Sequence, residues 1–428
     1  MSVFFLLLSL AILLVTCMRG LPIFIAAFVS GLVLVVTAGL NPVDLMLKTY
    51  GPGLGKYFGD FFFIFVFGAI FGKLTDISGA ADSIATIIIR KLGERFIIPS
   101  LIVACAVLTY GGVSVFVALF TVYSMMISLF RKANLPRRLI PAVYFGGAGS
   151  FVMILPGSPQ IQNLIPMKFL GTTAMAGLVP GLIVGAVEAV LIFTYLQWEV
   201  KRCRARGEGF TERENETVPQ GRAAERKLPH PLVAILPMVV LLVSLNVFKL
   251  ESALALFVGI VSAMVLYSPF IDWARISKHL GAGTMEGTTS LFNTAAIVGF
   301  GYLVQTAPAF QAAISALTTT GLNPLLASAT AIGSLVFISG SGSGALSIVM
   351  PILTNIYMPI HAVDPDALHR VATMACMGTT PPFNGLVVTV LAVCGFSHKE
   401  AYGPIGVVTL AIPFLCLVLM VSLYMFVF

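Results

Sequence analysis

The scarcity of charged residues along long apolar runs constrains the fold of this chain more than any other sequence feature. Only 10% of its 428 residues are charged, whereas a soluble globular protein carries about 25%. With 58% hydrophobic residues, most of the chain cannot face water. At about 20 residues per spanning helix, the apolar sequence provides for roughly ten membrane helices. The sequence therefore predicts an all-α polytopic membrane protein and excludes a soluble enzyme.

Charge, cysteine and histidine usage exclude several other classes. The net charge of +7 comes from short basic loops without interleaved aromatic residues, so we expect no nucleic-acid partner. The six cysteines show no C-x-x-C spacing, and we expect no disulfide framework, no metal site and no cofactor. None of the five histidines is expected in the middle of a helix, which argues against a histidine proton relay.

Several apolar runs are too short to cross a membrane. Runs of 11 to 15 residues are typical of half-helices or re-entrant arms, and a backbone break at membrane depth is tolerated only where protein or a cavity surrounds it. The predicted helices lie near 2–18, 21–40, 60–73, 97–109, 113–130, 139–155, 173–198, 231–248, 252–270, 285–305, 324–338, 344–360, 368–378, 384–395 and 404–428.

One long polar segment, 199–230, divides the apolar sequence into halves 1–198 and 231–428. It carries eight Lys or Arg and six Glu, which indicates a solvated linker. Basic loops favour the cytoplasm, and one orientation gathers 20 of the 25 Lys and Arg residues on the side of this linker. We therefore predict a cytoplasmic linker, both termini outside, and a multi-pass protein of the inner (plasma) membrane.

This orientation predicts two opposed re-entrant hairpins. Segment 96–130 lies between cytoplasmic basic clusters and enters from the inside, whereas 324–360 enters from the outside. The two halves share weak sequence similarities at an offset of about 225–233 residues. One example is Phe67-Gly68 with Phe300-Gly301, and these similarities support two inverted repeats. Inverted repeats are typical of secondary transporters.

The two hairpin tips carry small residues that suit ligand contact. In the second tip, Ser339, Ser341, Gly342 and Ser343 belong to a six-residue Ser/Gly run. The first tip has Gly111, Gly112 and Ser114. Such residues let backbone amides and hydroxyls face a ligand where helix ends meet. The alternative is a small-residue packing seam.

Two proline-containing breaks add further polar candidates, and ordinary loops are the alternative interpretation of both. Proline leaves backbone carbonyls that need partners. The candidates in the first break are Gly157, Ser158, Gln160 and Asn163, in a helix broken around 156–163. Those in the second break are Thr379, Thr380 and Asn384, in a helix broken around 379–384.

Two kinds of group could couple transport to a cation. Glu188 is the deepest carboxylate of the apolar sequence and could carry a proton. Oxygen atoms of Ser341, Ser343 and Asn384 could hold Na⁺ instead. Glu188 could also pair structurally with a neighbour, so both interpretations stay open.

At these motifs the sequence resembles the gluconate permease family of the ion transporter superfamily, over about residues 20–198 and 231–428. The resemblance lies in FGAIFGKLTDISGAA at Phe67–Ala81, IRKLG at Ile89–Gly93, the Pro156–Pro159 break and the Gly340–Ala345 run. It implies an elevator-type fold, in which a scaffold and a mobile transport domain enclose a small organic anion, and a homodimer. Gly112 and Pro381-Pro382 differ from the gluconate branch, so the implied substrate is the broader class of small carboxylates.

The sequence thus predicts a cation-coupled (H⁺ or Na⁺) symporter of a sugar acid, hydroxy acid or other carboxylate, and no enzyme. A sodium/proton antiporter on the same architecture is the first alternative. An intramembrane serine hydrolase is a remote one, because Ser341 and Ser343 lack a G-x-S-x-G elbow and a helix-centred base.

Overall fold

The computed structural model describes residues 2–18, 21–92, 96–212, 227–306, 322–377, 380–382 and 384–428, and every regular element within them is helical. The helices before the linker are α1 Ser2–Met18, α2 Ile23–Thr37, α3 Pro42–Leu45, η1 Met46–Tyr50, α4 Gly51–Ile77, α5 Ala80–Leu92, α6 Ile97–Tyr110, α7 Val115–Lys132, η3 Arg137–Leu139, α8 Ile140–Ala148, α9 Phe151–Ile154, α10 Ile161–Leu170 and α11 Leu178–Ala205. The helices after it are α12 Pro231–Asn246, α13 Ser252–Leu266, η5 Ser268–Phe270, η6 Trp273–Arg275, α14 Ile276–Thr306, α16 Pro324–Ser339, α17 Gly342–Tyr357, α18 Pro365–Met377, α19 Gly385–Cys394, α20 His398–Gly406, η7 Val407–Ala411 and α21 Ile412–Phe426.

Several of these helices begin where the sequence supplies a polar cap and a proline. The Asn41 and Asn323 side chains accept hydrogen bonds from N–H groups in the first turns of α3 and α16. Pro42 and Pro324 follow directly. Proline fits the first helical position because its missing N–H would have no helical partner there.

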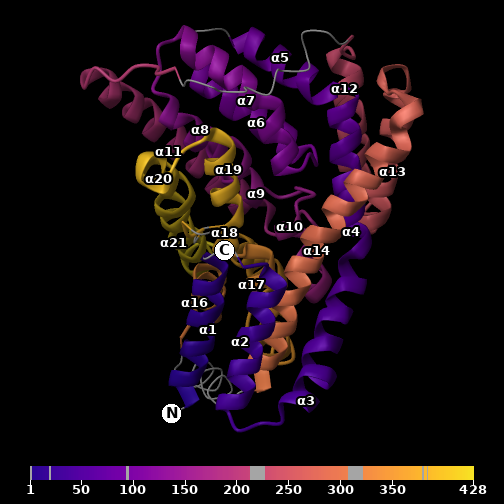
Figure 1. Cartoon of the computed structure of the whole chain (residues 1–428), viewed down its shortest axis with the longest axis vertical. Coiled ribbons are helices and arrows are strands. Elements are labelled where there is room, and N and C mark those ends of the chain that lie inside the picture. The colour runs from indigo at the N-terminus through magenta and orange to yellow at the C-terminus, as the bar shows by residue number, and fades with distance from the viewer. Residues whose placement is uncertain are drawn as a thin grey trace.

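Two long helices, α4 and α14, lie side by side along one side of the molecule (Figure 1). They approach backbone to backbone, since a Cβ atom on Gly287 of α14 would lie 2.8 Å from the Val66 Cα in α4. Gly283, one turn earlier, also faces α4, at Ile70. Small residues allow this close approach between membrane helices.

The middle of the molecule contains helices that border the predicted breaks and the second tip. Figure 1 shows α9, α10, α17 and α18 there. Helix α10, from before the linker, packs against α17 and α18, from after it. Two consecutive helix pairs, α6 with α7 and α16 with α17, are joined by short turns within the predicted ranges 96–130 and 324–360. The sequence-distant breaks and tips are thereby assembled around one region.

Some helices differ from the prediction. Helix α5 was not predicted, because its charged residues interrupt the apolar pattern. Helix α10 was not predicted either, because it follows a proline-rich break. Helix α11 continues to Ala205, beyond the expected end at residue 198, because its last turns are charged and lie past the apolar run.

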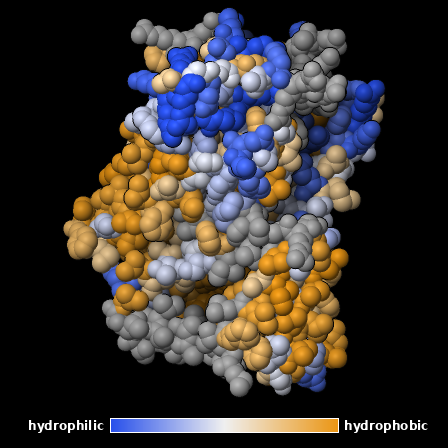
Figure 2. Space-filling model, turned by 60° about the vertical axis from the view of Figure 1, so that its left-hand side comes forward, coloured by the Kyte–Doolittle hydropathy of each residue, from blue (hydrophilic) through white to orange (hydrophobic). Residues whose placement is uncertain are grey.

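The outer surface suits a lipid environment. Figure 2 shows hydrophilic residues gathered at one end of the molecule, the end where α5 lies in Figure 1, and broad hydrophobic areas below it. Along α11, Leu182 is 49% and Val190 63% exposed, whereas Gly181 and Gly185 face inward. Within the described residues, three stretches are long and apolar enough to cross a membrane: Pro42–Ile77, Leu178–Ala205 and His398–Phe426.

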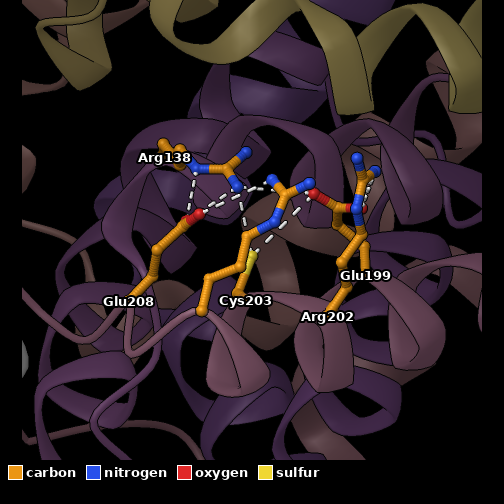
Figure 3. A network of polar contacts seen from close by, with 6 residues as sticks. Arg138, Glu199, Arg202, Cys203 and Glu208 are labelled. Carbon is orange, nitrogen blue, oxygen red and sulfur yellow. Dashed lines mark hydrogen bonds and ion pairs between the residues drawn. The ribbon is translucent and has the colours of Figure 1, made fainter.

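The start of the linker is fixed to the helical body by an ion-pair network (Figure 3). Arg138 donates to Glu208 Oε2 from Nε at 3.0 Å and from Nη2 at 2.8 Å. Its Nη2 also contacts Glu199 Oε1 at 3.4 Å and Cys203 Sγ at 3.1 Å. The hydrogen bonds from Arg138 hold the pKa of Glu208 below its usual range.

We expect Gly287→Ala to destabilise the protein by about 1–3 kcal/mol, because the new methyl group would overlap α4. The matched control is Gly281→Ala on the same helix, where a Cβ meets nothing within 4 Å. That variant should gain up to about 1 kcal/mol from helix propensity. Thermal unfolding in detergent measures both, and equal melting temperatures for the two variants would contradict the close α4–α14 contact.

We expect Glu208→Gln to lower stability at neutral pH, where the Glu208 carboxylate is ionised and paired with Arg138. Because the folded-state pKa is lowered, this contribution is complete above the ordinary pKa of glutamate and disappears as the pH falls through the lowered value. The melting-temperature difference between wild type and variant should therefore shrink in acid. A difference that does not change with pH would argue against the ion pair.

Candidate functional site

The four predicted tips and breaks share one structural property, which is that each ends at a helix N-terminus. Ser114, Gln160, Ser341 and Asn384 directly precede α7, α10, α17 and α19, respectively. Ser341 Oγ accepts from the Gly344 N–H at 3.2 Å, and Asn384 Oδ1 accepts from the Leu386 N–H at 2.9 Å. A helix N-terminus carries about half a positive charge and attracts anions.

The first tip is closely packed against neighbouring helices. Gly112 has φ of +92°, a conformation that favours glycine, and a Cβ there would lie 3.4 Å from Phe71 and Leu241. Gly111 ends α6 beside Met238 of α12. These two glycines therefore fulfil a packing and turn requirement.

Side-chain hydrogen bonds join the first break to the first tip. Gln160 Nε2 donates to the Thr109 carbonyl at 2.6 Å, and Tyr110 Oη donates to the Pro156 carbonyl at 2.8 Å. Gly157 has φ of +81°, and its carbonyl accepts from Asn246 Nδ2 at 3.0 Å. The carbonyls that this break exposes are thus satisfied by protein donors.

The second break contacts the second tip in a similar way. Asn384 Nδ2 donates to the Gly340 carbonyl at 2.9 Å, and Thr380 Oγ1 donates to the Met377 carbonyl at 3.2 Å. Gly342 packs against Cys376 of α18, and Ser343 is half-buried in the first turn of α17. Ser339 is the last residue of α16, and Thr379 lies outside the described residues.

Asn163 connects the two halves through a buried histidine. Its Nδ2 donates to the carbonyls of Ser158 at 2.9 Å and Ala174 at 3.0 Å, so its Oδ1 faces His369 Nε2 at 3.0 Å. His369 Nδ1 lies 2.6 Å from Thr172 Oγ1. This network assigns the proton of a neutral His369 to Nε2, with Thr172 donating to Nδ1.

The expectation that no histidine lies in the middle of a helix is wrong for His369. The helix was expected to begin at residue 368, but α18 begins at Pro365, where Asp364 Oδ1 accepts from the Asp366 N–H at 3.2 Å. The earlier start places His369 in the second helical turn, fully buried. The Asp-Pro pair before the apolar run could have indicated this start.

Arg370 is a second residue that the sequence analysis did not select. It is fully buried, and its guanidinium donates to the carbonyls of Ile154 at 2.7 Å, Ala174 at 3.4 Å and Ala176 at 2.6 Å. These carbonyls flank the first break. An arginine within an apolar run is the signal that could have identified it.

Glu188 is buried on the face of α11 that contacts the first break. Gly185 and Gly181, one and two turns earlier, pack against Leu155 and Pro156, respectively. Neither carboxylate oxygen of Glu188 has a hydrogen-bond partner among the described residues. No hydrogen bond between described residues links Glu188 to the other candidate residues, so it stands apart from the tip-and-break contacts.

Comparisons with known proteins identify the family of this chain. Residues 1–380 match the GntP family permease profile. The chain is 30% identical to the uncharacterized transporter YxjC of Bacillus subtilis over 96% of each chain. It is 33% identical to the high-affinity gluconate transporter of Escherichia coli over 28% of this chain and 27% of that protein.

The fold also resembles a solved structure, that of the Alcanivorax borkumensis YdaH transporter. The TM-score is 0.59, at 12% sequence identity, over 87% of each chain. The family match excludes the serine hydrolase alternative, because the family consists of permeases. The chain therefore belongs to the GntP family of permeases and is a multi-pass membrane transporter, not an enzyme.

Proposed function

We propose that this protein is a secondary active transporter that couples the movement of a cation to that of a small organic anion, such as a sugar acid or hydroxy acid. The observation that carries this proposal is the gathering of polar residues at four helix N-termini, those of α7, α10, α17 and α19. Such ends favour a carboxylate. The partial similarity to a gluconate transporter supports the same substrate class.

The proposed binding site lies where the two tips meet the two breaks. Asn384 is its central residue, because its side chain joins the second break to the second tip at Gly340. Ser341 and Ser343 supply hydroxyl groups at the start of α17. Asn163, Ser158 and Gln160 form the opposite wall, at the start of α10.

The proposed architecture consists of two inverted repeats, 1–198 and 231–428, separated by a cytoplasmic linker, 199–230. The α6–α7 and α16–α17 pairs are then opposed re-entrant hairpins, and both breaks belong to a transport domain that moves against a scaffold. Helices from before the linker pack against helices from after it, as α10 does against α18, and this packing supports the proposed architecture. We propose a homodimer, by analogy with other elevator-type transporters.

Glu188 is the proposed proton carrier. An ionised carboxylate without a partner in a low-dielectric interior costs several kcal/mol, so the buried and unpartnered Glu188 is favoured in its protonated form. Its helix packs against the first break through Gly181 and Gly185, which offers a route by which protonation of Glu188 responds to rearrangement there. The oxygens of Ser341, Ser343 and Asn384 are the candidate ligands if Na⁺ is the coupling ion instead.

The orientation predicts which end of the molecule faces the cytoplasm. Cys203 is fully buried and cannot report it, so exposed positions are needed. Arg204→Cys, in the last turn of α11, should be protected from impermeant thiol reagents in intact cells, whereas Lys48→Cys, beside α3, should be labelled. Permeabilised cells provide the control, and the reverse pattern would invert the proposed topology.

Asn384→Leu should raise the dissociation constant for the substrate at least tenfold, about 1.4 kcal/mol, because it removes the amide that joins tip and break. Asn355→Leu, the same substitution at an exposed position of α17, should leave binding unchanged. Binding of a panel of organic acids to purified proteins measures the effect. Equal affinities for wild type and Asn384→Leu would move the site elsewhere.

A further inference from the structure

The guanidinium of Arg370 lies in a cage of neutral oxygen atoms. Its Nε donates to the Ala176 carbonyl at 3.0 Å, its Nη1 to Ile154, and its Nη2 to Ala174 and Ala176. All three acceptors are backbone carbonyls from the segment that contains the first break. The side chain thus reaches from α18, in the second half, into the first half.

The positive charge of Arg370 is not neutralised at close range. Among the described residues, no ion pair within 4 Å includes Arg370. The nearest acidic residue on its own helix is Asp366, whose Oδ2 accepts from the Gly177 N–H at 3.3 Å and which is exposed. Tyr424 and Tyr110 are the other titratable neighbours.

A purely structural clamp does not require a charge. A buried ion without a counter-ion is costly, and the effect of its charge extends further in a low-dielectric interior than in water. A neutral amide could bond two of the same carbonyls at lower cost. Because the charged guanidinium of Arg370 is fully buried, its positive charge points to an electrostatic role beyond holding the backbone.

The neighbours of Arg370 place this charge beside the proposed anion site. The preceding residue, His369, bonds Asn163 on α10. Tyr110, at the end of α6, bonds the Pro156 carbonyl two residues after Ile154. Arg370 is thus directly connected to the break at which α10 begins.

We propose that Arg370 is the fixed positive charge that selects an anionic substrate, acting as a positioning residue through its field and through the break it holds. This inference rests on the proposed function and deepens it. It requires that the substrate carry a carboxylate, and that a neutral polyol of the same shape bind poorly.

The test uses the full-length protein in proteoliposomes with radiolabelled gluconate as the probe, together with glycerate and lactate. Arg370→Lys keeps the charge and loses part of the hydrogen bonding, whereas Arg370→Gln also keeps only part of the hydrogen bonding and loses the charge. We expect Arg370→Lys to keep KM within about threefold of wild type and Arg370→Gln to raise it at least tenfold. Arg275→Gln, at an exposed arginine, is the matched control and should change neither KM nor Vmax.

A clamp without an electrostatic role gives a different pattern. In that case both variants lose melting temperature and Vmax in proportion to the hydrogen bonds removed, while KM stays at the wild-type value. That result would overturn the inference. Uptake of none of the three acids by wild-type protein would instead overturn the proposed function, before any variant is compared.

A measurement on the wild type covers the case in which the variants do not fold. Sorbitol has the carbon skeleton of gluconate without its carboxylate. We expect excess sorbitol to leave gluconate uptake unchanged, whereas unlabelled gluconate abolishes uptake of the label. Competition by sorbitol at concentrations similar to those of gluconate would show that no positive charge selects the substrate, and would refute the proposal.

Discussion

Interrupted helices inside a membrane leave backbone carbonyls without their helical partners, and there is no water in the bilayer core to replace them. In this protein the first interruption is stable because side chains from three other helices, and one from within the break itself, reach its carbonyls. Arg370 bonds Ile154, Tyr110 bonds Pro156, and Asn246 bonds Gly157. These donors come from α18, α6 and α12, while Asn163 of α10 bonds Ser158. The break and its surroundings therefore form one cooperative unit.

The second interruption is satisfied more locally. Asn384 bonds Gly340, and His398 Nε2 contacts the Pro382 carbonyl at 2.7 Å, without a buried arginine among the described residues. The positive charge is thus concentrated at the first break and the hydroxyl groups at the second tip. An anion that has both a carboxylate and hydroxyl groups would match such an asymmetric arrangement, in agreement with the proposed substrate class.

Glu188 and Arg370 are both buried ionisable residues, and their surroundings differ. Burying an ionised group without a partner is costly in free energy. Carbonyl oxygens surround the Arg370 guanidinium, whereas neither carboxylate oxygen of Glu188 has a hydrogen-bond partner among the described residues. Arg370 of α18 bonds the Ile154 carbonyl beside the first break, whereas Glu188 lies on the face of α11 whose glycines pack against that break. We propose that the break therefore senses the proton and the anion together, which is what symport requires.

The sequence alone determined the membrane class, the helix pairs and the positions of both breaks, because hydrophobicity, proline and glycine act locally along the chain. Ser341 and Asn384 could be selected from such local signals. The roles of His369 and Arg370 could not, because their partners Asn163 and Ile154 are about 200 residues away in sequence. Only the packing of α9 and α10 against α18 brings them together, since a hydrogen bond depends on distances in space that the order of residues does not specify.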